Sequence, residues 1–116
     1  MNNLKPPVLT DDLIQRATDY VNAGAYRLRG RHSWRIPAIV AEQWHRQGFA
    51  LLRTNTLARH YGVQRKTMWK TIKGVIDAGF IREVGRTDDG IAMYAPCLER
   101  GDEWRAGQME PAAHEH

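Results

Sequence analysis

The feature that most constrains the fold is a glycine between two short amphipathic stretches, in TNTLARHYGVQRKTMWKTIKGVIDAGFI, residues 54–81. Thr54 or Asn55 can cap a helix whose apolar positions are Leu57, Ala58 and Tyr61. Gly62 follows this stretch at once, and glycine tolerates positive φ, so the chain can turn sharply there. Val63 can then be buried in the angle between this helix and the next.

The stretch after the glycine predicts a second helix over about 64–78, ended by Gly79. Its apolar stripe comprises Met68, Ile72, Val75 and Ile76. At about 100° per residue, another face gathers Lys66, Trp69, Lys70 and Lys73, with Arg65 at its edge. The second helix is therefore expected to present an exposed basic face.

Two helices joined by a tight glycine turn, the second with a basic face, are typical of a DNA-binding helix-turn-helix. Gln64 can pair with adenine, and Arg65 or Lys66 with guanine, because these side chains match the donors and acceptors of those bases. Lys70 and Lys73 can neutralise phosphates. A lysine-rich helix on its own is more often an ordinary solvated face, and the adjoining turn is what favours the DNA-binding interpretation.

A β-hairpin is predicted directly after the second helix. Phe80 to Arg86 has the composition of a strand, and Ile91 to Ala95 that of the returning strand. Thr87-Asp88-Asp89-Gly90 between them contains the Asp-Gly pair that tight hairpin turns prefer. The succession of helix, helix-turn-helix and hairpin predicts a winged helix.

The segment LARHYGVQRKTMWKTIKGVIDAGFI resembles the DNA-binding part of winged helix-turn-helix bacterial regulators, most closely the GntR type. The matching positions are Leu57, Ala58, Gly62, Val63, Arg65, Thr67, Gly79, Phe80 and Ile81, in register and without a gap. The resemblance covers roughly residues 36–95. It departs from the family pattern at Gln64, which replaces the usual Ser or Thr cap, and at Gly74, which costs ~1 kcal/mol relative to alanine inside a helix.

The resemblance implies DNA contacts at Gln64, Arg65, Lys66, Thr67 and Trp69. For Trp69, stacking on DNA and packing under the hairpin are both open. Asp88 and Asp89 would face phosphates at the hairpin tip, so Arg86, or Arg82 on the strand, is expected to contact DNA instead. The full candidate set is Thr54, Gln64, Arg65, Lys66, Thr67, Trp69, Lys70, Lys73, Arg82 and Arg86. GntR-type regulators usually carry a larger effector domain after the hairpin, and only about 20 residues follow it here, so no small-molecule effector is expected.

The N-terminal half of the chain adds helices to this unit. Residues 1–9 are expected to form a flexible arm, and Thr10 followed by two aspartates starts a helix over about 11–28. The basic stretch 27–35 is expected to be a loop. Pro37 and Gly48 fit the first turn and the end of another helix, and residues 49–52 fit a short strand. We expect a mainly α-helical α+β fold with one domain over 10–97 and an acidic tail over 98–116.

Charge and residue types exclude several function classes. Residues 53–86 hold 8 Lys/Arg and 2 Asp/Glu, whereas residues 87–116 hold 2 and 7, so the positive charge is local. Cys97 is the only cysteine, which excludes an internal disulfide and, without an apolar run or leader pattern, favours the cytoplasm. His32, His45 and His60 are too widely spaced for a recognised metal site, and His114 and His116 are terminal. No catalytic motif is present. We therefore expect no cofactor, metal or enzymatic activity.

These observations predict a sequence-specific, double-stranded DNA-binding transcriptional regulator, most simply a repressor. A homodimer is expected because two-fold symmetry doubles the few base contacts of one module, with the helix at 11–28 as the candidate contact; packing of that helix onto its own domain is the alternative. Two other functions stay open: a plasmid or phage replication or partition protein, and a winged-helix protein-interaction module. Trp34, Trp44 and Trp104 are expected in the core or at the dimer interface.

Overall fold

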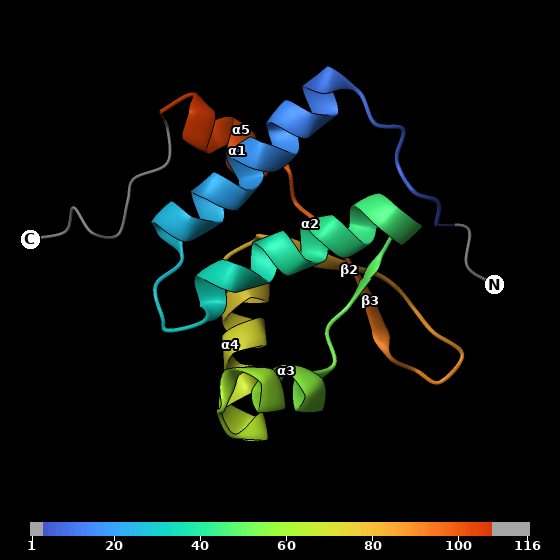
Figure 1. Ribbon diagram of the computed structural model, residues 1–116, viewed down its shortest axis with the longest axis vertical. Helices are drawn as coiled ribbons and strands as arrows, with labels where there is room; N and C mark the ends of the chain where they lie inside the picture. Colours follow the sequence, from blue (N-terminus) through green and yellow to red (C-terminus); the bar gives the residue numbers. More distant parts are fainter. Residues whose placement is uncertain (1–3, 108–116) are drawn as a thin grey trace, which may run out of the picture.

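The computed structural model describes residues 4–107 and is mainly helical, with a small antiparallel sheet (Figure 1). The helices are α1 (Asp11–Arg27), α2 (Ile36–Gln47), α3 (Thr54–Tyr61), α4 (Arg65–Asp77) and α5 (Glu99–Arg105), with a 3₁₀ turn at Ser33–Arg35. The strands are β1 (Ala50–Leu51), β2 (Ile81–Arg86) and β3 (Ala92–Pro96). The prediction of a mainly α-helical α+β fold is confirmed.

The predicted starts and stops of the first two helices are confirmed. Thr10 caps α1, because its hydroxyl accepts a hydrogen bond from the Leu13 N–H at 3.1 Å. Pro37 lies in the first turn of α2, and Gly48 ends that helix at φ 89°. Lys5 of the N-terminal segment passes directly over Gly48, where a Cβ atom would come within 2.5 Å of the Lys5 backbone. Residues 1–3 of the expected arm lie outside the described residues.

Three antiparallel strands form the sheet in the order β1-β3-β2. Ala50 of β1 pairs with Tyr94, and Ile81 of β2 pairs with Pro96 at the start of the hairpin. The side-chain amide of Gln43 on α2 also holds β1, since it both accepts from the Leu51 N–H and donates to the Leu51 carbonyl, each at 3.0 Å. The two-residue strand is thus fixed on both sides.

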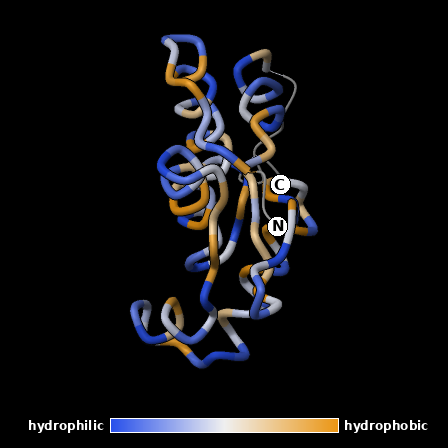
Figure 2. The backbone as a smooth tube through the Cα atoms, turned by 90° about the vertical axis from the view of Figure 1, so that its right-hand side faces the viewer, coloured by the Kyte–Doolittle hydropathy of each residue, from blue (hydrophilic) through white to orange (hydrophobic). Residues whose placement is uncertain are grey.

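The core lies between the helices and this sheet. Hydrophilic and hydrophobic residues alternate along each helix, so that every helix has a face to bury (Figure 2). Tyr20 of α1 is fully buried, its ring centroid is 5.9 Å from that of Phe80, and its hydroxyl donates to the Phe80 carbonyl at 2.6 Å. The other fully buried large side chains are Phe80, Ile36, Pro37, Val40, Met68, Ile72, Val75 and Ile81.

The predicted acidic tail is wrong for its first part, because Glu99–Arg105 form helix α5, which packs along α1 (Figure 1). Leu98 is buried and Gly101 touches the α1 backbone. Of its acidic residues, Asp102 pairs with Arg16 of α1 and Glu103 pairs with Arg100 within α5. The domain therefore extends beyond residue 97, and residues 108–116 lie outside the described residues.

Two arginine–aspartate pairs join α1 to α5. Arg16 donates to both carboxylate oxygens of Asp102, at 3.1 and 2.7 Å. Arg105 donates to both oxygens of buried Asp19, at 3.1 and 2.9 Å. The hydrogen bonds from Arg105 and Arg16 lower the pKa of Asp19 and of Asp102, respectively, and burial opposes each effect.

These lowered carboxyl pKa values predict acid sensitivity. Because the unfolded aspartates have the higher pKa, the unfolded state takes up more protons in acid. The contribution of the pairs is full above about pH 4 and is lost as the pH falls through the lower, folded-state pKa values. Urea denaturation should thus show a lower free energy of unfolding in acid. Asp19→Asn should be less stable at neutral pH and lose less stability on acidification, whereas Asp88→Asn in the exposed hairpin turn should follow the wild type; equal acid dependence in all three would contradict this.

Candidate nucleic-acid interface

The turn between α3 and α4 fixes the angle at which α4 leaves the domain. Gly62 adopts φ 67° and ψ 35°, the left-handed conformation that glycine permits. The next N–H, of Val63, donates to the Ala58 carbonyl at 2.9 Å, which closes the end of α3. The predicted cap of α3 at Thr54 or Asn55 is wrong. Arg53 holds the cap position, because its carbonyl already accepts from the Leu57 N–H at 3.0 Å and Thr54 lies inside the first turn.

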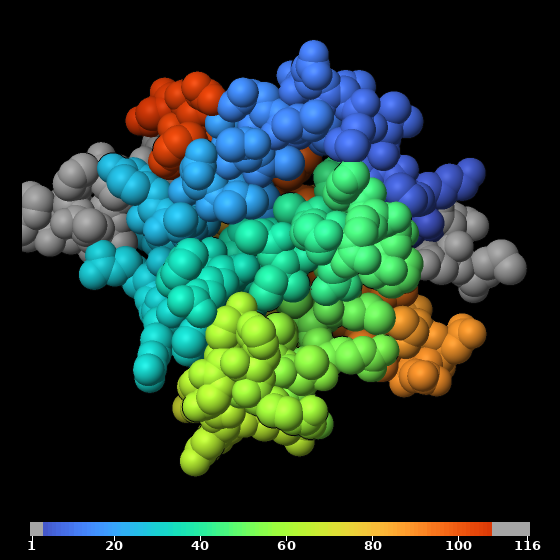
Figure 3. Space-filling view, in the orientation of Figure 1, coloured from blue at the N-terminus to red at the C-terminus, as the bar shows by residue number. Residues whose placement is uncertain are grey.

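Helix α4 has one buried and one exposed face, as predicted. Met68, Ile72 and Val75 are at most 1% exposed. On the opposite side, Lys66, Lys70 and Lys73 are exposed. Only Lys73 has an ion-pair partner among the described residues, Asp77 at 3.5 Å. We call the three lysines the basic face of α4; it belongs to the α3–α4 region that projects at the lower edge of the molecule (Figure 3).

The N-terminal end of α4 is open and basic. Gln64 occupies the cap position in an extended conformation, and its side chain makes no capping hydrogen bond. Arg65, Lys66 and Thr67 follow and are exposed, with no acidic residue in the first turn. The unpaired N–H groups and the positive end of the helix dipole add to these charges. This end of α4 can therefore bind an anion or donate hydrogen bonds to acceptor atoms of a ligand.

The side chain of Trp69 on α4 faces the hairpin, and 46% of its surface is exposed. On one side it lines a hollow of about 670 Å³ with Thr54, Arg65 and Lys66. On the other it lines a smaller hollow of about 330 Å³ with hairpin residues that include Tyr94. The sequence left open whether Trp69 packs under the hairpin or is free to stack on DNA. In the structure the indole borders the hairpin and is also open to solvent beside Arg65 and Lys66.

The two hairpin arginines are placed differently from each other. Arg86 lines the smaller hollow near Trp69, but its guanidinium donates to Glu83 at 3.0 Å and to the Gly90 carbonyl at 2.7 Å. Arg82 lies on the opposite face of the hairpin from Arg86, because a β-bulge between Glu83 and Gly85 shifts the register: Arg82 pairs with Ala95 and Arg86 with Ala92. It lies near Cys97, where burial raises the pKa of the thiol and Arg82 opposes that rise. The structure therefore groups Arg86, but not Arg82, with the basic face of α4.

The stretch 27–35 is joined to the end of α3 by ring contacts that sequence reasoning missed. The His32 ring stacks on Tyr61 with centroids 4.7 Å apart, and the Arg35 guanidinium lies over Trp34 and Tyr61 at 4.8 and 5.3 Å. Burial, and then the charge of Arg35, lower the pKa of His32. Trp34, expected in the core or at an interface, is 41% exposed beside Arg35.

Within residues 4–107, no group of three or more His, Cys, Asp or Glu side chains could hold a metal ion. Over the same residues, no helix is both long enough and apolar enough to cross a membrane. His114 and His116 lie outside the described residues.

The structure thus brings together Thr54, Gln64, Arg65, Lys66, Thr67, Trp69, Lys70 and Lys73 on α3, α4 and the turn between them. Arg86 is adjacent but engaged within the hairpin. Comparisons with protein-family models, with curated proteins and with solved structures found no significant match to this chain.

Proposed function

We propose that this chain is a winged helix-turn-helix protein that binds double-stranded DNA in a sequence-specific manner and regulates transcription, most simply by blocking promoter access. The observation that carries the proposal is the basic face of α4, which stands opposite a fully buried apolar stripe. A helix of 13 residues is about 20 Å long, and one anchored by one face can enter the major groove with the other.

The N-terminal residues of α4 take the base-reading role in this proposal. Arg65 can donate two hydrogen bonds to guanine, and the uncapped Gln64 side chain is available for adenine. Thr67 and Trp69 can contact a thymine methyl group. Lys66, Lys70 and Lys73 contact phosphates along the groove, where they release bound counterions.

The hairpin supports α4 rather than reading the minor groove with its tip. Asp88 and Asp89 are exposed at that tip and would repel phosphates. Trp69, at the junction of α4 and the hairpin, can stack on a sugar at the edge of the groove. Arg86 can contact DNA only if its guanidinium gives up its hydrogen bonds to Glu83 and to the Gly90 carbonyl.

The proposal is tested by repeated selection from random duplex DNA at about 150 mM salt, a concentration that screens weak surface attraction. The wild type should enrich a defined motif. Arg65→Ala should lose discrimination at a single base pair in each half-site, at a cost of about 1–3 kcal/mol.

A matched control is Arg59→Ala, which removes an arginine from an exposed position on α3 outside the candidate set. This variant should enrich the same motif as the wild type. No enrichment by the wild type, with binding that vanishes as salt rises, would contradict the proposal and favour a protein-interaction module. Several closely spaced footprints on one fragment would favour a replication or partition role.

Dimerisation is part of the proposal, and α1 offers a surface for it. One face of α1 packs on α5 and α2 of its own domain, while Leu13, Ile14 and Val21 line an apolar groove of about 460 Å³ with Trp44 of α2. Ile14 is 50% exposed there. A two-fold contact along this groove would give a symmetric dimer of the kind that reads two half-sites.

Light scattering at micromolar concentration should give the mass of a dimer for the wild type. Ile14→Asp should shift the protein to monomer, because it places a charge in the apolar contact. Ala25→Asp, at an exposed position of α1 outside the groove, should remain a dimer. A monomeric wild type, with and without DNA, would remove dimerisation from the proposal.

A further inference from the structure

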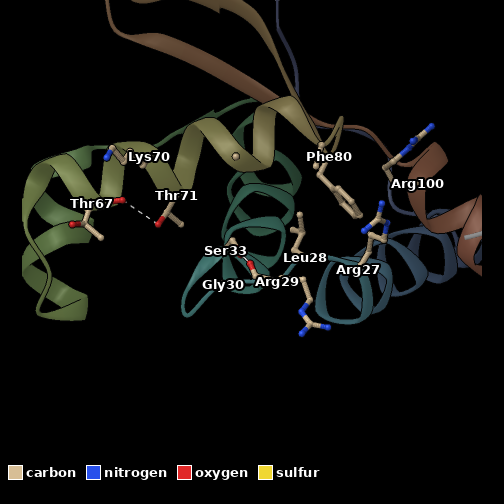
Figure 4. A pocket seen from close by; sticks show the side chains of 12 residues that line it. Arg27, Leu28, Arg29, Gly30, Ser33, Thr67, Lys70, Thr71, Phe80 and Arg100 are labelled. Atoms are coloured by element: carbon tan, nitrogen blue, oxygen red, sulfur yellow. Dashed lines mark hydrogen bonds between the residues drawn. The ribbon is translucent and has the colours of Figure 1, made fainter. Parts of the chain in front are cut away.

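Another hollow, of about 540 Å³, lies on the side of α4 away from the hairpin. Helix α4 forms one side of it, and the end of α1 with the following loop forms the other (Figure 4). The loop is held in shape by Gly30, at φ 106°, and by the Ser33 hydroxyl, which donates to the Arg29 carbonyl. The volume is within the range of small-molecule sites.

The lining of this hollow is strongly cationic. Arg27, Arg29, Lys70 and Arg100 line it, and no carboxylate does. Among the described residues, Arg27, Arg29 and Lys70 form no ion pair. Like charges gathered without a counter-charge repel one another, so an anion bound among them would be stabilised.

Arg100 adds a more specific observation. Its terminal nitrogen donates to Glu103 at 2.6 Å, but its Nε–H is buried and has no hydrogen-bond partner. Buried donors are rarely left unpaired, because the unmet group costs free energy. Because this Nε–H is closed to solvent, a ligand oxygen would supply the missing acceptor only if the Arg100 side chain turned toward the hollow.

The remaining lining gives the hollow room for more than an oxyanion. Phe80 and Leu28 provide apolar surface, and the ring of Phe80 projects between α4 and α1 (Figure 4). Gly74 of α4 leaves one wall bare, since a Cβ atom there would meet nothing within 4 Å. Helix packing therefore does not require this glycine, and its absent side chain enlarges the hollow.

We propose that this hollow is a binding site for an organic phosphate, whose negative charge is balanced by Arg27, Arg29, Lys70 and Arg100, spread along the lining (Figure 4). Arginine and lysine are the side chains that bind phosphates, arginine through paired N–H donors. Lys70 belongs both to this site and to the basic face of α4. The phosphate can come from a free molecule such as a nucleotide or from the backbone of DNA bound along α4. The site rests on its own geometry and stands whether or not the DNA proposal holds.

The test is a titration of the ¹⁵N-labelled full chain with adenosine monophosphate at constant ionic strength and without DNA, followed by amide NMR. Saturable shifts are expected at Gly30, Ser33 and Gly74. Arg29→Ala should weaken binding at least about tenfold, because it removes a charged hydrogen-bond donor. Gly74→Leu keeps every positive charge but fills the hollow, and should abolish binding while favouring the helix.

Arg46→Ala is the matched control, since it removes an exposed arginine of α2 outside the hollow, and it should bind as the wild type does. Shifts spread over the surface without saturation, or equal binding by wild type and Gly74→Leu, would overturn the proposal. A fall in DNA affinity at saturating adenosine monophosphate would identify the DNA backbone as the competing source of phosphate. Unchanged DNA affinity, or no DNA binding at all, with saturable nucleotide binding, would identify a site for a free phosphorylated molecule.

Discussion

Replacing Gly101 with alanine is expected to destabilise the protein by about 3 kcal/mol and to lower its Tm by roughly 10–20 °C. A Cβ atom at this position would lie 2.3 Å from the Tyr20 nitrogen and 2.6 Å from the Tyr20 Cα. These are backbone atoms inside α1, so no side-chain rotation can relieve the overlap and α5 must move away. That movement loosens the Arg16–Asp102 and Arg105–Asp19 pairs, which depend on the same approach of the two helices.

The matched control is the same substitution at Gly74, which also lies inside a regular helix with an ordinary φ. A Cβ atom there meets nothing, so Gly74→Ala should stabilise the protein by up to about 1 kcal/mol through helix propensity alone. Thermal and urea denaturation of the two variants should show opposite signs. Equal changes in the free energy of unfolding would mean that α5 does not pack closely on α1.

Replacing Lys66, Lys70 and Lys73 together with alanine is expected to weaken DNA binding by roughly two orders of magnitude at about 150 mM salt. The observed binding constant varies as the salt concentration to the power of about −0.9 for each phosphate contact. Each lost contact then costs roughly fivefold at this salt, and the slope of log K against log salt should become shallower by about three. Fluorescence anisotropy over a salt series measures both quantities.

The control is a Lys5→Ala, Arg46→Ala variant, which loses two positive charges from the N-terminal segment and α2. Its salt slope should stay close to that of the wild type, because the N-terminal segment and the last turn of α2, which holds Arg46, lie away from α4 (Figure 1). If the two variants change the slope equally, the attraction to DNA depends on net charge and not on the basic face of α4.

Helix and strand positions could be predicted from the sequence where one local cause decides them. The glycine turn at Gly62, the buried stripe of α4 and the hairpin turn before Gly90 are each set by a few neighbouring residues. The basic face of α4 followed from the same periodicity that placed Met68 and Ile72 in the core.

The docking of α5 could not be predicted, because its causes lie far apart in the chain. Glu99–Arg105 contains three acidic residues and only one large apolar side chain, Trp104, so by itself it has the composition of a charged tail. It is a helix because Asp102 and Gly101 meet partners on α1 that are more than 80 residues away.

The phosphate hollow was missed for a related reason. The charge of the 27–35 stretch is plain in the sequence, but Lys70 and Arg100 come from two other elements, and only the fold brings them to Arg27 and Arg29. Likewise, the stacking of His32 on Tyr61 depends on how the loop crosses α3. Sequence periodicity shows which face of a single helix or strand is apolar, but it does not show which residues of different elements come into contact.

The contact between α1 and α5 also determines when the protein can finish folding as it is synthesised. Asp19 leaves the ribosome 86 residues before its partner Arg105 in the helix that covers this part of α1. Until α5 emerges, the nascent chain holds Asp19 without Arg105 and the Tyr20 backbone without its Gly101 contact. Joining segments at such separation carries a loop-closure cost. A nascent chain that stops before α5 therefore leaves this side of α1 open to chaperones and proteases.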